Sequence, residues 1–268
     1  MQYLVCYAVA LIVALLAKSW KKAAFITLPI LFLLTQIVPG YVPRTKVALV
    51  ENKKLKLLFF NVYSGNRNYN RFMDYVKSEN PDIIVLAEVN YKWWNALAEL
   101  RTDYPHHKES LRDDNFGIAM LSRIPFDEAA IVKRGNRGVP SIRALLFNKK
   151  LCIWGTHPLP PRRLDYSINR NKQLKFLANK VVAGSNTVII GDLNTVPWSP
   201  YFKDLLTDAN LYDSRQGYGN QASWPSGNSL IRIPIDHCLL SPSINVISRK
   251  IGPDLYSDHL PVVIEIEF

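Results

Sequence analysis

The sequence predicts an α/β sandwich that is preceded by a hairpin of two apolar helices. Helical patterns alternate with short strand-like runs, and several of these runs follow one another directly, separated by loops with Pro and Gly. Hydrophobic residues make up 48% of the 268 residues, enough for the core of one sizeable domain. Only about the first 40 residues lack the mixed pattern of a globular domain.

The N-terminal segment predicts a membrane hairpin at residues 1–42. Residues 1–17 are uncharged, and residues 23–42 form a second uncharged stretch of 20 residues. At about 1.5 Å per residue, a helix of about 20 residues spans the core of a bilayer. Pro29 is tolerated there, because neighbouring groups can satisfy the freed carbonyl. A cleaved signal peptide is the main alternative, although no positive charge precedes the first stretch, and two buried core helices are another.

Charge near the hairpin bears on orientation and partners. Lys18, Lys21 and Lys22 favour a cytoplasmic turn and an extracytoplasmic domain, whereas the basic residues of 44–56 argue for the opposite; the short turn carries more weight. The net charge is +11, and residues 1–56 hold eight of the 33 Lys and Arg but one of the 22 acidic residues. Most of the excess therefore lies where it attracts lipid headgroups, and it says little about nucleic acid.

The rest of the chain divides into a basic linker at 43–56 and a domain at 57–268. Helical patterns predict four helices, at 70–78, 92–101, 168–182 and 200–207, and in the third of these the apolar residues 174, 177, 178 and 181 mark one face at three- and four-residue spacing. Apolar and β-branched runs predict eight strands, at 57–61, 83–88, 117–122, 142–147, 151–156, 187–191, 235–240 and 261–267. The cysteines at 6, 152 and 238 lie in apolar contexts and predict free thiols.

Polar side chains stand at the ends of six of these apolar runs. Thr187-Val188-Ile189-Ile190 leads into Gly191-Asp192-Leu193-Asn194, and Ser257-Asp258-His259 comes just before the last strand. The remaining four runs meet a polar residue in the same way, at Asn61, Glu88, His157 and Asp236. Carboxylate, amide and imidazole groups delivered at strand ends are what a metal-assisted hydrolytic site requires.

In this order, these residues resemble the endonuclease/exonuclease/phosphatase superfamily, which includes DNase I-like nucleases, inositol polyphosphate 5-phosphatases and neutral sphingomyelinases. The resemblance covers about residues 55–268 and extends to the runs 116–125 and 235–241. The runs 156–161 and 194–199 resemble bacterial members with N-terminal membrane segments. The resemblance implies two packed mixed sheets flanked by helices, a site at one edge of the sandwich, and a bacterial inner-membrane protein with an extracytoplasmic catalytic domain.

The resemblance also assigns a metal site. Glu88 corresponds to the family's Mg²⁺ ligand, Asn61 is expected beside it, and Asp258 is a second carboxylate near the ion. Mg²⁺ keeps several waters and takes one or two protein carboxylates, so this sparse set suffices. Mn²⁺ suits the same oxygen ligands.

Five residues are expected to act on the phosphoester. Asp192 and Asn194 share a face of an extended chain. The resemblance implies that Asp192 orients or deprotonates the attacking water and that Asn194 holds the phosphate. The resemblance also pairs Asp236 with His259, and a carboxylate bonded to one imidazole nitrogen fixes the tautomer of the ring. His259 is then expected to act either as a general base or as a charged group that stabilises the phosphate. His157 is expected to donate to a non-bridging oxygen.

Substrate contacts are expected from Arg143, Trp198 and Trp224. His237 alternates to the opposite face from Asp236 and is expected to pack in the core, whereas His106 and His107 are expected in a surface loop. The leading function is a membrane-anchored, divalent-metal-dependent phosphoesterase, most simply a phosphodiesterase, acting on nucleic acid or lipid headgroups. The alternatives are a catalytically silent phosphate-binding module and a secreted nuclease or sphingomyelinase-like enzyme released by cleavage near residue 40. No protein partner is inferred.

Overall fold

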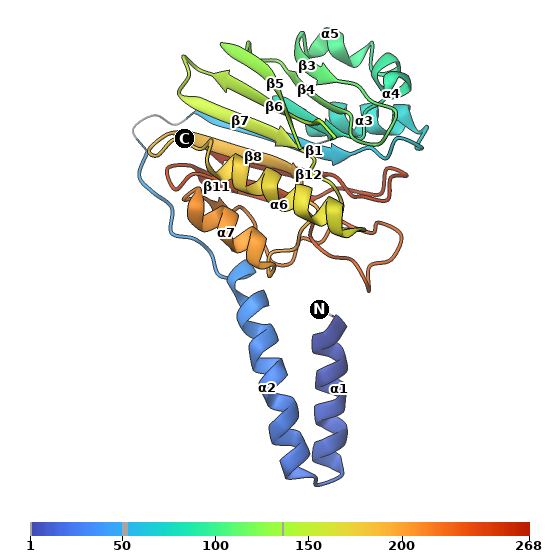
Figure 1. Cartoon of the computed structure of the whole chain (residues 1–268), viewed down its shortest axis with the longest axis vertical. Helices are drawn as coiled ribbons and strands as arrows, with labels where there is room; N and C mark the ends of the chain where they lie inside the picture. The colour runs from blue at the N-terminus through green and yellow to red at the C-terminus, as the bar shows by residue number, and fades with distance from the viewer. Residues whose placement is uncertain (1, 50–52, 136) are drawn as a thin grey trace.

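Two six-stranded mixed sheets pack face to face, helices cover both outer faces, and a helical hairpin projects from one side (Figure 1). This computed structural model describes residues 2–49, 53–135 and 137–268. The predicted sandwich of two mixed sheets flanked by helices is confirmed.

The first sheet has the order β11-β12-β1-β2-β4-β3. Its only parallel pair among the described strands is β1 with β2; the other neighbours are antiparallel. In chain order its strands are β1 (Lys54–Asn61), β2 (Ile83–Ala87), β3 (His106–Ser110), β4 (Ile118–Ser122), β11 (Asn245–Ile251) and β12 (Val262–Glu267).

The second sheet has the order β5-β6-β7-β8-β10-β9, and β7 pairs in parallel with β8. Its strands are β5 (Glu128–Arg134), β6 (Val139–Leu146), β7 (Leu151–Thr156), β8 (Asn186–Asp192), β9 (Tyr212–Asp213) and β10 (Asp236–Leu240). The structure adds four strands that the sequence patterns do not predict: β3, β5, β9 and β11. His106 and His107 therefore lie on strand β3, and their prediction as loop residues is wrong.

Alternation along the strands builds three layers of core. In β1, Leu57 and Phe59 face the opposing sheet, whereas Leu58 and Phe60 face the helices on the outside. The outer face of the second sheet is covered in the same way, with Trp154 and Ile189 packed against the helices that follow β7 and β8. Strands β1, β2, β7 and β8 are therefore packed on both faces, and this packing fixes the edge of the sandwich where they end.

Of the four helices predicted for the domain, two lie where expected, one is displaced and one is divided. Helix α3 (Tyr69–Glu79) and α7 (Pro200–Asp208) lie where expected, and α6 (Leu164–Ala178) begins four residues earlier than its pattern. The single helix expected at 92–101 is two, α4 (Tyr91–Ala96) and α5 (Leu100–Asp103). Asn90 caps α4 by accepting a hydrogen bond from the backbone N–H of Trp93.

The N-terminal hairpin consists of α1 (Gln2–Leu16) and α2 (Trp20–Ile37), followed by a short 3₁₀ turn, η1 (Val38–Gly40). The two helices pack side by side through small residues, since Ala14 and Ala23 are buried while Leu16, Phe25 and Phe32 are largely exposed. Within the described residues, one helix, Trp20–Gly40, is long and apolar enough to cross a membrane, and Leu4–Leu16 is a shorter apolar helix.

The chain after the hairpin is bound to the sandwich. The Gly40 carbonyl accepts hydrogen bonds from the N–H groups of Gly217 and Gly219, at 2.9 and 2.8 Å. Further on, Val47 exchanges two hydrogen bonds with the side-chain amide of Asn245. The predicted linker 43–56 therefore runs along the domain rather than free of it, over the part that is described; residues 50–52 lie outside the described residues.

Candidate active site

The polar residues predicted at strand ends meet at one edge of the sandwich. Asn61 ends β1, Glu88 follows β2, His157 follows β7 and Asp192 ends β8. Parallel strands deliver their carboxyl ends to the same edge, so each parallel pair brings two of these residues together. Asp236 opens β10 directly opposite Asp192 in the antiparallel register.

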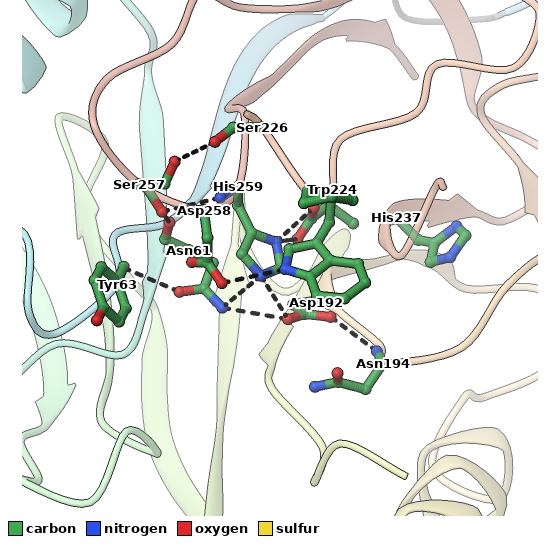
Figure 2. Close-up of polar contacts among 12 residues, drawn as sticks. Asn61, Tyr63, Asp192, Asn194, Trp224, Ser226, His237, Ser257, Asp258 and His259 are labelled. Atoms are coloured by element: carbon green, nitrogen blue, oxygen red, sulfur yellow. Dashed lines mark hydrogen bonds and ion pairs between the residues drawn. The ribbon is translucent and has the colours of Figure 1, made fainter. Parts of the chain in front are cut away.

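The centre of the cluster is the Asp192 carboxylate (Figure 2). Its Oδ2 atom lies 3.2 Å from Asn61 Nδ2, 3.5 Å from His157 Nε2 and 3.6 Å from His259 Nε2. Its Oδ1 atom accepts a hydrogen bond of 2.8 Å from the backbone N–H of Asn194. Burial disfavours the charged form, but His259 and His157 outweigh it, so the pKa of Asp192 is lowered and the group is ionised.

His259 and Asp236 form a buried pair. Nδ1 of His259 lies 2.9 Å and 3.1 Å from the two carboxylate oxygens of Asp236. Burial of the imidazole lowers its pKa, but Asp236 and Asp192 more than offset this and raise it to about 10. Ser257 holds the loop in place, because its Oγ donates to the Asn61 carbonyl and accepts from the His259 N–H. The raised pKa favours the protonated, cationic form of His259 at neutral pH.

His157 and Glu88 complete the cluster. Burial lowers the pKa of His157, but the hydrogen bond to Asp192 and the charge of Asp192 raise it overall. Its Nδ1 atom has no hydrogen-bond partner among the described residues. Glu88 accepts a 3.1 Å hydrogen bond from Asn61 Nδ2, and burial raises its pKa. Glu88 and Asn194 both adopt positive φ, 62° and 49°, a conformation that non-glycine residues keep mainly at functional sites.

Close strand approach positions the second half of the cluster. A Cβ atom at Gly191 would lie 1.8 Å from the Thr156 carbonyl oxygen, so only glycine fits between β8 and β7. The next residues along the two strands are Asp192 and His157, which this approach brings into contact.

The donor set fits a hard divalent cation in two overlapping places. The only hydrogen bond to Glu88 Oε2 among the described residues comes from the Ser64 N–H at 3.5 Å. Asp258 lines the same pocket, and its charge acts on the Glu88 carboxyl. Asp192, Asp236 and His259 also place one ligand atom each within 4.8 Å of one another. Because His259 already occupies both oxygens of Asp236, we favour Glu88, Asn61 and Asp258 as the cation ligands.

A pocket of about 550 Å³ opens over the cluster. It is lined by Glu88, His157, Asp192, Asn194, Asp258 and His259, and also by Phe116, Arg162, Tyr166, Arg170, Trp224 and Ile233. The Nε1–H group of Trp224 donates to Asp258 at 3.1 Å, which places this indole inside the site. Nδ2 of Asn194 donates to the Pro158 carbonyl at 2.9 Å and so ties the loop after β8 to the loop after β7.

Two residues predicted to contact substrate, Arg143 and Trp198, lie outside the lining of this pocket in the described structure. Arg143 lies in the middle of β6 and pairs with Glu128 of the neighbouring strand at 3.7 Å. Trp198 is exposed in the loop before α7, next to the lining residue Ser199 but outside the lining.

Arg170 lines the pocket and was missed by sequence reasoning. It is buried in α6 and donates a 2.8 Å hydrogen bond to the Asn194 carbonyl, and burial lowers its pKa. A signal existed, because Arg170 stands four residues before Leu174 and therefore on the apolar face of that helix.

His237 packs in the core, facing away from the cluster (Figure 2). Its Nε2–H donates to the Thr195 carbonyl at 2.9 Å, and its ring lies 4.5 Å from that of Phe202. Nδ1 has no hydrogen-bond partner among the described residues, so a second proton would add an unpaired charge. Burial accordingly lowers the pKa of His237 from 6.5 to about 4.

We therefore expect His237 to make the fold acid-sensitive. The unfolded chain binds a proton below about pH 6.5 and the folded chain only near pH 4, so stability is lost as pH falls between these values. The linked loss is on the order of 3 kcal/mol. The Tm of His237→Gln should change less between pH 7 and pH 5 than the Tm of the unmodified protein. Surface variant His107→Gln is the control, and an equal pH response of all three proteins would contradict the prediction.

The two-sheet sandwich with carboxylate, amide and imidazole groups at its strand ends defines a phosphoesterase-type fold and site. A model of the Endonuclease/Exonuclease/phosphatase family matches residues 58–259, and the chain belongs to this family. No curated protein matches the chain.

Solved structures share the fold at low sequence identity. A humanized D. rerio TDP2 is 17% identical with a TM-score of 0.66, over 80% of this chain and 99% of that one. The 3′ phosphatase NExo from Neisseria, bound to a product DNA hairpin, is 18% identical with a TM-score of 0.66, over 80% and 100%. A family member from Beutenbergia cavernae is 19% identical with a TM-score of 0.63, over 81% and 72%.

Proposed function

We propose that the chain is a membrane-anchored, divalent-metal-dependent phosphoesterase, and most simply a phosphodiesterase, that hydrolyses nucleic-acid or lipid-headgroup phosphoesters by attack of water. The observation that carries the proposal is one connected cluster at the edge of this family's fold. Glu88, His157, Asp192 and His259 line the pocket there, and the buried side chains of Asn61 and Asp236 contact them from below.

A Mg²⁺ or Mn²⁺ ion held by Glu88, Asn61 and Asp258 would supply charge to offset the phosphate and polarise its oxygens. The chain's own residues do the rest. The ionised Asp192 orients the attacking water, and its lowered pKa favours orientation over storage of a proton. His259 is held as a cation by Asp236, which favours a stabiliser of negative charge over a general base. His157 donates to a non-bridging oxygen.

Membrane anchoring by residues 1–42 is supported by the apolar surface of the hairpin. Val5, Val9, Leu16, Phe25 and Phe32 are more than half exposed, an arrangement that water disfavours and lipid favours. We propose an inner-membrane location with the domain outside the cytoplasm, from the charge of the turn at Lys18, Lys21 and Lys22. Release of a shortened, soluble protein on cell fractionation would favour the secreted alternative.

The test uses the full-length chain in detergent micelles with Mg²⁺, assayed on bis(p-nitrophenyl) phosphate and on supercoiled plasmid. We expect hydrolysis of the small diester that EDTA abolishes and added Mg²⁺ restores. A folded protein that hydrolyses neither substrate, with or without metal, would favour the silent phosphate-binding module and contradict the proposal.

Replacing His259 with Ala removes the cation that Asp236 supports, and we expect kcat to fall by about 10²- to 10⁴-fold. Asp236→Asn should give part of the same loss, because it removes the charge that holds the imidazole protonated. Single-turnover rates on bis(p-nitrophenyl) phosphate measure both. Wild-type turnover in His259→Ala would remove His259 from the mechanism.

Trp224 contributes ring contact and one hydrogen bond to Asp258. We expect Trp224→Ala to raise KM several-fold, up to about tenfold, because aromatic contacts contribute about 0.5–1.5 kcal/mol. Trp224→Phe keeps a ring and should raise KM less. Steady-state kinetics of the two variants check this, and unchanged kinetics of Trp224→Ala would exclude substrate contact.

A further inference from the structure

Several exposed apolar side chains lie on chain segments that also contribute to the pocket lining. They are Leu164, Ile168, Trp198, Tyr201, Leu230 and Ile231, here called the apolar rim, and Leu230 and Leu164 are 80% and 78% exposed. The rim comes from three separate segments, and each segment also supplies a pocket-lining residue within three positions of the rim residues: Tyr166, Ser199 and Ile233. Water disfavours such a gathering of large apolar groups, which marks it as a contact surface.

The segments that carry the rim lie on the side of the sandwich where the hairpin is attached. Helices α6 and α7 lie between the sheets and the hairpin, and the orange loop before β10 extends toward the same side (Figure 1). Lys203 of α7 donates to the Gln36 side chain at 2.6 Å, in the last turn of α2. Gly40 is bonded directly to Gly217 and Gly219. There is no spacer between hairpin and sandwich among these residues, so if α2 crosses a bilayer, α7 stands at the bilayer surface.

The composition of the rim suits that surface. Trp and Tyr rings prefer the headgroup level of a membrane, and Leu and Ile side chains enter the acyl boundary below it. Val38, Tyr41 and Val42, which connect α2 to the sandwich, are also about half exposed and continue the apolar surface from the hairpin. Arg44 and Lys46 follow them, and basic residues there attract anionic headgroups.

The charges of the pocket argue against a nucleic-acid duplex as the partner of this face. Nucleic acid is bound by several cations that track its phosphates. Among the described residues, the lining has no lysine and two arginines, Arg162 and the buried Arg170. Its other cations are the imidazoles of His157 and His259 at the reaction centre, and they face the four carboxylates of Glu88, Asp114, Asp192 and Asp258. A single phosphoester presented by a lipid needs no such track.

We infer that the apolar rim docks on the lipid bilayer that holds the hairpin, and that the pocket thereby takes its phosphoester from a phospholipid headgroup. The inference rests on the proposed phosphoesterase function for its substrate and on the proposed membrane anchor for its geometry, but the docking itself is testable without any activity.

Docking is measured with a fluorophore on the full-length chain in nanodiscs of mixed neutral and anionic phospholipids. In a Cys6→Ala background, Leu230→Cys is labelled with an environment-sensitive dye, and Val182→Cys is the matched control. Val182 is 68% exposed just beyond the opposite end of α6. We expect blue-shifted emission at residue 230 and water-like emission at residue 182. Water-like emission at both positions would overturn the docking.

The substrate is tested with Leu230→Glu/Ile231→Glu and the control Val182→Glu. In nanodiscs, the double variant should release water-soluble phosphate ester from the lipid at least about tenfold more slowly, because burying each apolar side chain is worth about a decade in an equilibrium constant. Hydrolysis of bis(p-nitrophenyl) phosphate in micelles should be unchanged, and Val182→Glu should behave as the unmodified protein.

The outcomes separate the two proposals. If the unmodified protein hydrolyses none of the substrates but the dye at residue 230 shows a blue shift, the phosphoesterase function is rejected and membrane docking is still supported. Plasmid nicking in nanodiscs as fast as in micelles, with no release from lipid, would overturn the lipid substrate and favour nucleic acid.

Discussion

The Asp192→Asn variant is expected to retain the fold and to lose at least about 10²-fold in kcat, and up to about 10⁴-fold. The side chain keeps its shape, so its Oδ1 atom can still accept the hydrogen bond from the Asn194 N–H. What is lost is the negative charge that faces Asn61, His157 and His259.

That charge has two effects on the cluster. It orients the attacking water, and it raises the pKa of both imidazoles, so neutralising it also weakens the two cations. Loss of kcat with little change in KM would indicate an interaction made in the transition state. The measurement is single-turnover hydrolysis of bis(p-nitrophenyl) phosphate at saturating Mg²⁺.

Asp208→Asn is the matched control, since this exposed carboxylate ends α7 outside the pocket. It should retain full activity, and both variants should give the circular dichroism spectrum of the unmodified protein. A folded Asp192→Asn protein within a factor of about three of the unmodified kcat would exclude Asp192 from the reaction.

The strands that could be predicted from the sequence and those that could not differ in their position within the sheets. All eight predicted strands lie inside the two sheets, whereas β3, β5, β9 and β11 are the four sheet edges. An interior strand is buried on both faces and shows a continuous apolar run. An edge strand such as β3, His106–Ser110, is polar and half-exposed, and its strand conformation comes from pairing with β4, which local sequence does not encode.

The site follows the same division. Asn61, Glu88 and Asp192 could be predicted because an apolar strand points each one at a common edge, and chain order is enough to recognise it. Arg143 stays a prediction outside the pocket lining, because local sequence does not show which face or edge of a sheet a charged strand residue serves. Arg170 was missed because its place in the pocket depends on how α6 packs across the second sheet, a tertiary property.

Glu88→Gln is expected to weaken divalent-metal binding by at least about 10- to 100-fold. Replacing a residue that only hydrogen-bonds to a metal ligand typically costs that much, and Glu88 is expected to be a ligand itself. Activity at low Mg²⁺ should fall accordingly and recover in part at high Mg²⁺, because Asn61 and Asp258 remain. Mn²⁺ binding followed by electron paramagnetic resonance measures affinity without any substrate.

The same measurement decides between the two arrangements of metal donors. If the ion sits at Glu88 and Asp258, then Glu88→Gln releases Mn²⁺ while Asp236→Asn leaves the affinity within about threefold, because Asp236 is occupied by His259. If the ion instead sits among Asp192, Asp236 and His259, Asp236→Asn releases it and Glu88→Gln does not. The second result would place the metal at the buried residues Asp192, Asp236 and His259 instead of at Glu88 and Asp258. His259 would then be a metal ligand and not a cation that faces the phosphate.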